Sequence, residues 1–312
     1  MESIITVKGL KKYFKDVKAV DDISFSVEKG ELLGFLGVNG AGKSTTINML
    51  CTLFSPTQGD ITICGCRLGK DDEKIRHHIG VVWQGNCLDE KLTVKENLFV
   101  RGSLYGFDTA ALKRQVASVC EKLQLSDIYD RRYANLSGGQ KRRCEIAAAL
   151  IHSPEVLFLD EPTTGLDPAT RRLVWESMDR LQKEEGTTIF LTTHYMEEAA
   201  CARHIAIIDS GKLKEFGTPF SLKERYARDK LHLIPQPDKM TSLRQLLSGM
   251  QIQDSDVTVG SDRLIVSLPD SMAGLPLIRE AEPYLSGFSL VQGSMDDVFL
   301  NVTGKNLQQE DL

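Results

Sequence analysis

The segment Gly37–Thr45 reads Gly-Val-Asn-Gly-Ala-Gly-Lys-Ser-Thr and decides the fold of the chain. It matches the pattern Gly-x-x-x-x-Gly-Lys-Ser, whose small residues let successive backbone N–H groups turn inward around a phosphate. The apolar run Leu32–Leu36 stands directly before it and predicts a buried strand, and Thr46–Phe54 has the apolar spacing of a helix. This order places the loop at a helix N-terminus, where the helix dipole favours an anion. The segment therefore predicts an α/β fold with a phosphate-binding loop.

Further strands and helices follow from the patterns around this segment. Ile4–Val7 and Val20–Val27 alternate like short strands. The strand-like runs Val156–Leu159 and Thr188–Thr192 flank the helical pattern Ala169–Glu184, and such a βαβ order implies a parallel sheet. From about Leu92 to Tyr133, apolar residues such as Leu112, Val116, Val119 and Leu123 recur at steps of three and four residues, which predicts a helical insert between the β/α parts.

The length of 312 residues, with 41% hydrophobic and 26% charged residues, is that of a globular chain with room for two domains. We expect a nucleotide-binding domain over residues 1–225, with a helical subdomain at about 88–150. Beyond it, the strand-like runs Val257–Val259 and Leu264–Leu268 and a helical pattern over Leu275–Leu285 predict a small α+β domain at 226–305. The polar residues 306–312 are expected to form a flexible tail.

Charge and cysteine content restrict the partners and the compartment. The net charge of −5 gives no general electrostatic reason to bind a polyanion, so we expect no nucleic acid partner. The seven cysteines contain no Cys-x-x-Cys pair, which favours reduced, mostly buried thiols. Cys64-Gly65-Cys66 could begin a metal site, but no second Cys/His pair at zinc spacing follows it.

Membrane insertion and secretion are both disfavoured by the pattern of apolar residues. The longest apolar stretches, such as Glu155–Asp160 and Ile205–Asp209, are far shorter than the ~18–20 residues of a membrane span. The residues from Met1 to Lys8 lack the basic and apolar regions of a cleaved secretory signal. We therefore expect a cytosolic chain.

Two adjacent acids end the apolar run that begins at Val156. Asp160 and Glu161 would stand at the carboxyl end of a buried strand, which is where α/β sheets place their ligands. Adjacent residues of a strand point in opposite directions. Asp160 could therefore hold Mg²⁺, directly or through water, while Glu161 polarises an attacking water as a general base.

A second glycine-rich helix start is present at Leu136–Gln140, which reads Leu-Ser-Gly-Gly-Gln and has no lysine. One nucleotide cannot easily occupy two helix N-termini, so we infer that this one caps the γ-phosphate of a nucleotide held by another copy. At this point the chain closely resembles the ATP-binding cassette ATPases, whose signature sequence this is. The resemblance covers about residues 3–220.

The resemblance extends to further positions and implies their roles. It includes Gln84 after Val82-Trp83, Asp167 in Gly165-Leu166-Asp167-Pro168, and His194 after the predicted strand. The aromatic that stacks on adenine would be Tyr13, or alternatively Phe14. The implied fold is that of P-loop NTPases, with a mixed sheet and a helical subdomain. It also implies a sandwich dimer that holds two ATP molecules at its interface.

The residues fall into overlapping groups by implied role. The catalytic residues would be Lys43, Gln84, Glu161 and His194. The Mg²⁺ ligands would be Ser44, Gln84 and Asp160. The nucleotide-binding residues would be Tyr13, Gly37, Val38, Asn39, Gly40, Ala41, Gly42, Lys43, Ser44, Thr45, Ser137, Gly138, Gly139, Gln140 and Asp167.

Three segments are similar to drug-resistance exporter ATPases of the daunorubicin type: Gly30–Thr45, Gly211–Pro219 and Met295–Gly304. This similarity implies ATP-driven export of drugs, antibiotics or lipids through a separate membrane permease, with the chain peripheral on the inner face of the cell membrane. The alternative is a soluble cassette that acts as a mechanical switch on nucleic acid or ribosomes. The absence of a heptad run and of a basic stripe disfavours it. The C-terminal domain would brace the dimer or regulate it.

Overall fold

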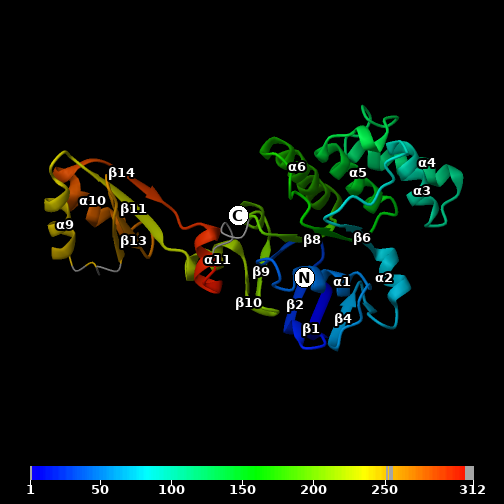
Figure 1. Cartoon of the computed structure of the whole chain (residues 1–312), viewed down its shortest axis with the longest axis horizontal. Coiled ribbons are helices and arrows are strands. Elements are labelled where there is room, and N and C mark those ends of the chain that lie inside the picture. Colours follow the sequence, from blue (N-terminus) through cyan, green and yellow to red (C-terminus); the bar gives the residue numbers. More distant parts are fainter. Residues whose placement is uncertain (1, 251, 253–255, 306–312) are drawn as a thin grey trace. The chain divides into compact units, whose positions relative to one another are not determined.

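The computed structural model describes residues 2–250, 252 and 256–305, and the predicted flexible tail at 306–312 lies outside them. The chain forms two compact units, Met1–Thr218 and Pro219–Leu312 (Figure 1).

The central element of the first unit is a six-stranded sheet in the order β10-β9-β3-β8-β7-β6. All neighbouring strands are parallel except β10 and β9, so the predicted mixed α/β sheet is confirmed. The inner strands β3, β7 and β8 are buried along their whole length, which explains their continuous apolar sequences. The strands span β3 Leu32–Leu36, β6 Ile79–Val82, β7 Val156–Asp160, β8 Thr188–Thr193, β9 His204–Asp209 and β10 Lys212–Gly217.

A second, antiparallel sheet has the order β2-β1-β4-β5. Its strands span β1 Ser3–Phe14, β2 Val17–Glu28, β4 Gln58–Ile63 and β5 Cys66–Arg67. The strands β1 and β2 are longer than the predicted Ile4–Val7 and Val20–Val27. The reason is an irregularity in the register between Val7 and Leu10, where the apolar alternation breaks while the backbone pairing continues.

Helices cover both sides of the mixed sheet. Figure 1 shows α3, α4, α5 and α6 on one side, and α1, α2 and the antiparallel sheet on the other. The helix α4 begins at its cap Asp108 and buries Leu112, Val116 and Val119, as the spacing of these residues predicts. The helices of this unit span α1 Lys43–Leu50, α2 Asp72–His78, α3 Val94–Ser103, α4 Thr109–Lys122, η1 Tyr133–Asn135, α5 Gly138–Leu150, α6 Pro168–Glu185 and α7 Met196–Ala199.

The second unit is built on an antiparallel sheet in the order β12-β13-β11-β14. The helices α9 and α10 pack on this sheet and bury Leu243, Leu247 and Leu277 against its strands. The predicted helix over Leu275–Leu285 is wrong at its end, because α10 stops at Ala281 and Pro283 lies in a 3-10 turn before β14. The elements span α8 Pro219–Tyr226, β11 Asp229–Pro235, α9 Met240–Gly249, β12 Val257–Val259, β13 Leu264–Leu268, α10 Gly274–Ala281, η3 Glu282–Tyr284, β14 Leu285–Val291 and α11 Met295–Thr303.

No helix in the described part of the chain has the length and apolar character to cross a membrane. The five parallel strands β3, β6, β7, β8 and β9 all end at one edge of the mixed sheet. The residues that follow them, among them Gly37, Gln84, Glu161 and His194, are therefore brought to that edge.

Candidate nucleotide-binding site

The glycine loop leads from β3 directly into α1, as the sequence predicts. Gly42 is the N-cap of α1 and has φ of 108°, a backbone conformation that favours glycine. A Cβ atom on Gly42 would also lie 2.5 Å from the carbonyl oxygen of Ala19. The loop can therefore pass close to the antiparallel sheet only because this position has no side chain.

A cleft of about 360 Å³ opens at the loop. Its lining combines the loop with the β1–β2 turn region and the ends of β6 and β7. The lining residues are Val17, Lys18, Ala19, Val38, Asn39, Gly40, Gly42, Lys43, Ser44, Thr45, Gln84, Glu161 and Ser210. Sequence reasoning missed Val17, Lys18, Ala19 and Ser210. Val17, Lys18 and Ala19 begin β2, and Ser210 lies in the turn between β9 and β10. Tertiary folding brings both segments to the loop, and no motif in the sequence indicates them.

Lys43 lies at the base of the cleft and is only 5% exposed. Its ammonium donates hydrogen bonds to the carbonyl oxygens of Gly37, at 2.7 Å, and Val38, at 3.3 Å. It also lies 3.4 Å from Oε1 of Glu161. The loop thus holds one buried cation beside one carboxylate.

Glu161 receives contacts from three polar side chains besides Lys43. Its Oε2 lies 3.4 Å from Nδ1 of His194 and accepts hydrogen bonds from Nε2 of Gln84 and Oγ1 of Thr164, both at 3.3 Å. The hydrogen bond with His194 and the charge of Lys43 lower the pKa of Glu161 to about 2. Glu161 is therefore a carboxylate at every pH near neutrality.

Asp160 differs from its neighbour in both direction and environment. Its Oδ1 accepts a 2.6 Å hydrogen bond from Thr192 Oγ1, on the adjacent strand β8, and burial raises its pKa. The backbone of Glu161 has φ of 45°, which is uncommon outside glycine, and is held by hydrogen bonds from its N–H to both oxygens of Thr192. Thr192 thus holds both acids in place. It can do so because the register of β7 and β8 places it beside Asp160, and no sequence motif indicates this role.

Two charged residues of α5 tie the helical part of the unit to the site, and sequence reasoning missed both. Arg142 donates hydrogen bonds to the carbonyl oxygens of Trp83, Pro162, Asp160 and Glu161. Glu145 accepts hydrogen bonds from the backbone N–H groups of Cys87 and Leu88, at 2.8 and 3.0 Å.

Both side chains are 5% exposed. A pair of charges within an otherwise buried helix was the available signal, because such charges require buried partners.

The second glycine-rich helix start forms the first turn of α5. The hydroxyl of Ser137 accepts a hydrogen bond from the backbone N–H of Gln140, at 3.3 Å, and the Gln140 side chain accepts one from the backbone N–H of Ser137, at 3.0 Å. This is a reciprocal helix cap. The described residues that line the cleft do not include Ser137, Gly138, Gly139 or Gln140.

The remaining predicted residues also stand apart from the cleft lining. Asp167 caps α6 and accepts hydrogen bonds from the N–H groups of Ala169 and Thr170. The hydroxyl of Tyr13 donates a 2.6 Å hydrogen bond to Asp21, and the ammonium of Lys18, a cleft residue, lies 5.5 Å from the Tyr13 ring. Gly37 and Ala41 lie within the loop, but the described residues that line the cleft do not include them, nor Asp160 and His194. Nδ1 of His194 does lie 3.4 Å from Oε2 of the lining residue Glu161.

Comparisons with known proteins identify the family of the chain. The family model described as ABC transporter matches residues 20–164. The daunorubicin/doxorubicin resistance ATP-binding protein DrrA of Streptomyces peucetius is 39% identical over 96% of this chain and 92% of its own length. The chain belongs to the ATP-binding cassette transporter family. It is an ATP-hydrolysing, ATP-binding subunit of a transporter.

Other cassette proteins are similar over the same range. The Nod factor export ATP-binding protein I of Rhizobium sp. (strain N33) is 38% identical over 98% of this chain and 98% of its own length. A solved dimeric structure of a bacterial ABC transporter cassette aligns with a TM-score of 0.63 and 27% identity, over 69% of this chain and 98% of that one. The predicted cassette fold is confirmed by this likeness.

Proposed function

We propose that this chain hydrolyses ATP at the Glu161 cleft to drive the export of a drug, an antibiotic or a lipid-like molecule through a separate membrane permease. The observation that carries this proposal is the contact of Glu161 with Lys43, Gln84 and His194 at the edge of the sheet where the parallel strands end. The likeness of the whole chain to ATP-binding proteins of drug resistance and Nod factor export supports the transport role.

The loop would bind the phosphates of ATP through the backbone N–H groups of residues 37–45 and the ammonium of Lys43. Tyr13, beside the cleft residue Lys18, would stack on adenine. Ser44, Gln84 and Asp160 offer hydroxyl, amide and carboxylate oxygens, a set of hard ligands that fits Mg²⁺. Bound Mg²⁺ would neutralise charge on the phosphates.

Glu161 would orient the attacking water and accept its proton. His194, which lies beside Oε2 of Glu161, would hold the carboxylate in place. A pKa of about 2 makes Glu161 a weak base while Lys43 lies beside it. When Lys43 turns to the phosphates of ATP, Glu161 loses one neighbouring cation and becomes more basic. We infer that substrate binding itself prepares the base.

The second glycine-rich helix start would complete the site of another copy. Ser137–Gln140 lies outside the cleft of its own chain, and its backbone N–H groups and helix dipole are suited to a γ-phosphate. Asp167, at the start of α6, would lie at the same interface. We infer a dimer in which each ATP lies between Lys43 of one copy and Ser137 of the other. A similar solved cassette is dimeric, which supports the dimer itself.

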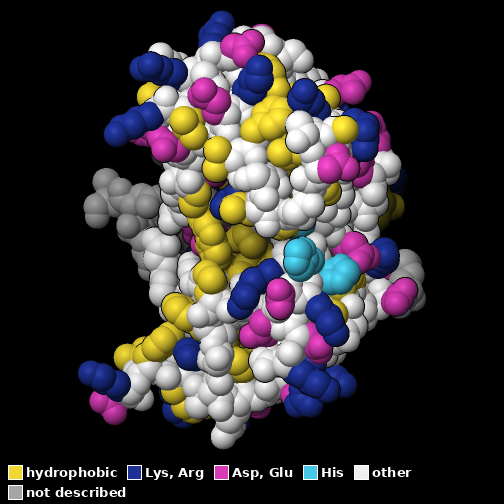
Figure 2. Space-filling view, turned by 90° about the vertical axis from the view of Figure 1, so that its right-hand side faces the viewer, with side chains coloured by type: hydrophobic (Ala, Val, Ile, Leu, Met, Phe, Trp, Pro, Cys, Tyr) yellow, Lys and Arg dark blue, Asp and Glu magenta, His cyan; other side chains and the backbone are white. Residues whose placement is uncertain are grey.

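The permease would dock on the side of the first unit that carries α2, α3 and α4, where Figure 2 shows apolar side chains gathered in a hollow. Leu53, Val100 and Leu104 are 59%, 56% and 71% exposed. The helix α2 joins the two ends of this surface, because Arg76 donates a hydrogen bond to Thr52 and the His77 ring contacts Tyr105. Gln84 follows α2 and β6, so a permease here would act directly on the nucleotide site.

This arrangement would place the chain in the cytoplasm, peripheral on the inner face of the cell membrane. Residues 1–225 would form the nucleotide-binding domain, with its helical subdomain at about 88–150. The domain at 226–305 would brace the dimer or its permease contact. The net charge of −5 favours the transporter role over a switch on nucleic acid.

The test is capture of tagged Glu161→Gln chain from membranes with Mg-ATP, with hydrolysis by the wild-type chain measured in parallel. We expect a polytopic membrane protein to co-purify, and Leu104→Glu to release it. Leu173→Glu is the matched control, because Leu173 is 52% exposed on α6. Turnover with only soluble partners or nucleic acid would contradict the export role.

A further inference from the structure

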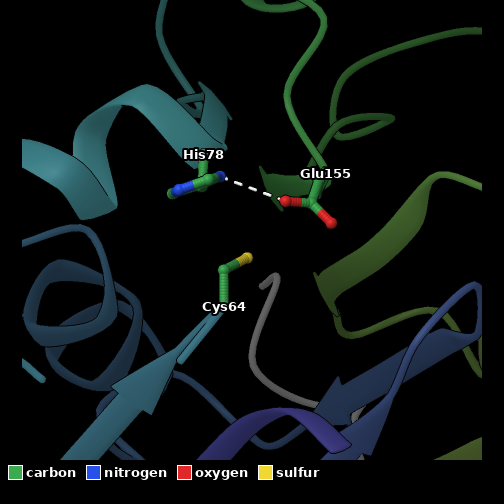
Figure 3. Close-up of side chains that lie close together, drawn as sticks. All are labelled: Cys64, His78 and Glu155. Atoms are coloured by element: carbon green, nitrogen blue, oxygen red, sulfur yellow. Dashed lines mark ion pairs between the residues drawn. The ribbon is translucent and has the colours of Figure 1, made fainter. Parts of the chain in front are cut away.

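A cluster of three potential metal ligands lies outside the nucleotide site. Cys64, His78 and Glu155 offer a sulfur, a nitrogen and an oxygen atom that all lie within 4.8 Å of one another. Figure 3 shows the Cys64 side chain pointing toward the space between His78 and Glu155. No pattern of spacing in the sequence links these three residues. Cys64 does belong to the segment Cys64-Gly65-Cys66, which by its sequence could begin a metal site.

Three different elements bring the ligands together. Cys64 begins the turn between β4 and β5, His78 ends α2, and Glu155 directly precedes β7. The pairing of β6 with β7 places His78 beside Glu155, and the N–H of Glu155 donates a 3.0 Å hydrogen bond to the carbonyl oxygen of His78. The N–H of Cys64 is held by the carbonyl oxygen of Ile4, at 2.8 Å. The backbone therefore fixes all three positions.

The side chains are already oriented toward a common centre. Nδ1 of His78 lies 3.1 Å from Oε1 of Glu155, while Lys29 holds Oε2 of Glu155 at 2.8 Å. Lys29 thus leaves Oε1 to face His78. The side chains of His78 and Glu155 are each 39% exposed, so an ion can enter from solvent. Tetrahedral zinc separates its ligand atoms by about 3.3–3.7 Å, which small side-chain rotations of this cluster can reach.

We propose that Cys64, His78 and Glu155 bind a divalent transition-metal ion of the zinc class through Sγ, Nδ1 and Oε1, with water in the fourth position. A mixed sulfur, nitrogen and oxygen set selects zinc over Mg²⁺ or Ca²⁺, which take oxygen ligands. Binding releases the thiol proton of Cys64 to solvent as the metal–sulfur bond forms. The ion joins the β4–β5 hairpin of the antiparallel sheet to the edge of the mixed sheet.

This role is structural rather than catalytic. The cluster lies at the amino ends of β6 and β7, whereas Gln84 and Glu161 follow the carboxyl ends of the same strands. Glu155 and Glu161 stand on either side of β7, six residue steps or about 20 Å of extended strand apart. The proposal is independent of the transport function, and zinc binding is expected to leave the rate of ATP hydrolysis unchanged.

The test is titration of the full-length chain with Zn²⁺ against a chromophoric chelator, followed by the absorption spectrum of the Co²⁺ form. We expect Cys64→Ser and His78→Gln to weaken zinc binding more than about 100-fold and to remove the thiolate-to-cobalt absorption. The matched controls Cys66→Ser and His77→Gln, each close in sequence to a ligand, are expected to bind within about twofold of wild type.

Equal affinity in the ligand and control variants would overturn the proposal. X-ray absorption of the zinc-loaded wild-type chain gives an answer that does not depend on how any variant folds. One sulfur at about 2.3 Å with nitrogen and oxygen neighbours is expected. A shell without sulfur, or with more than one, would overturn the site as assigned.

Discussion

The two glycine-rich helix starts of the cassette unit, at α1 and α5, differ in what they can do alone. At α1, the buried Lys43, the loop and Glu161 share one cleft. At α5, Ser137 and Gln140 cap the helix, and the described residues lining that cleft do not include them. Both starts present backbone N–H groups to an anion, but at α1 a buried cation and a carboxylate, Lys43 and Glu161, line the same cleft as the loop. The comparison indicates that the second start serves a phosphate held by another chain.

The largest expected effect is loss of hydrolysis when the carboxylate beside α1 is removed. We expect Glu161→Gln to reduce phosphate release by about 10²–10⁴-fold, because it removes the group that accepts the proton of water. ATP binding should remain, and the ATP-bound dimer should accumulate in size-exclusion chromatography. Unimpaired turnover by this variant would remove Glu161 from the mechanism.

A negative charge placed at the start of α5 tests whether the two helix starts have different roles. Ser137→Asp keeps a good helix cap but puts a negative charge where the γ-phosphate is expected. Hydrolysis should fall about 10²-fold, the scale of losing one transition-state contact, while ATP affinity of the single chain is unchanged.

Thr93→Asp is the matched control, because Thr93 caps α3 with the same reciprocal hydrogen bonds. Equal loss of hydrolysis in both variants would mean that the effect is not specific to α5.

Acid titration tests the electrostatics at α1. The pKa of Glu161 is lowered to about 2, so the stability that it contributes is present above its unfolded pKa and is lost as pH falls toward 2. At pH 7 we expect Glu161→Gln to unfold with about 2–3 kcal/mol less free energy than wild type. The difference should shrink between pH 5 and 2 in urea unfolding curves. A difference in the free energy of unfolding that stays constant across this range would show that ionised Glu161 does not contribute this stability.

The smallest expected effect concerns the cap of α5 itself. Ser137→Ala removes the acceptor for the N–H of Gln140 and should lower the free energy of unfolding by about 1 kcal/mol. Thermal or urea unfolding measures this loss. A much larger loss would mean that Ser137 stabilises more than the first turn of α5.

Much of the fold was predictable because its decisive segments are locally encoded. The glycine loop, the buried strands β3, β7 and β8, and the helical pattern of α4 are read from spacing alone. The end of α10 was wrong because the apolar pattern continued past Ala281 while Pro283 stopped the helix. The strands β11 and β14 were not predicted, since β14 is largely exposed and lacks a clear alternation.

The site was predictable where strand ends determine it and not where tertiary contacts do. Parallel strands bring Lys43, Gln84 and Glu161 to one edge of the sheet, so their proximity follows from the order of elements. The contacts of Arg142 and Glu145 follow only from how α5 packs, because their partners are backbone groups of distant loops.

The most direct test of the account mixes two inactive variants, Lys43→Ala and Ser137→Asp. A dimer of one with the other has one site with both defects and one site with neither. We predict that each variant alone hydrolyses almost no ATP and that an equal mixture recovers about a quarter of wild-type turnover, since half of randomly formed dimers are mixed. A mixture that forms mixed dimers and stays inactive would contradict the assignment of the two helix starts to one nucleotide.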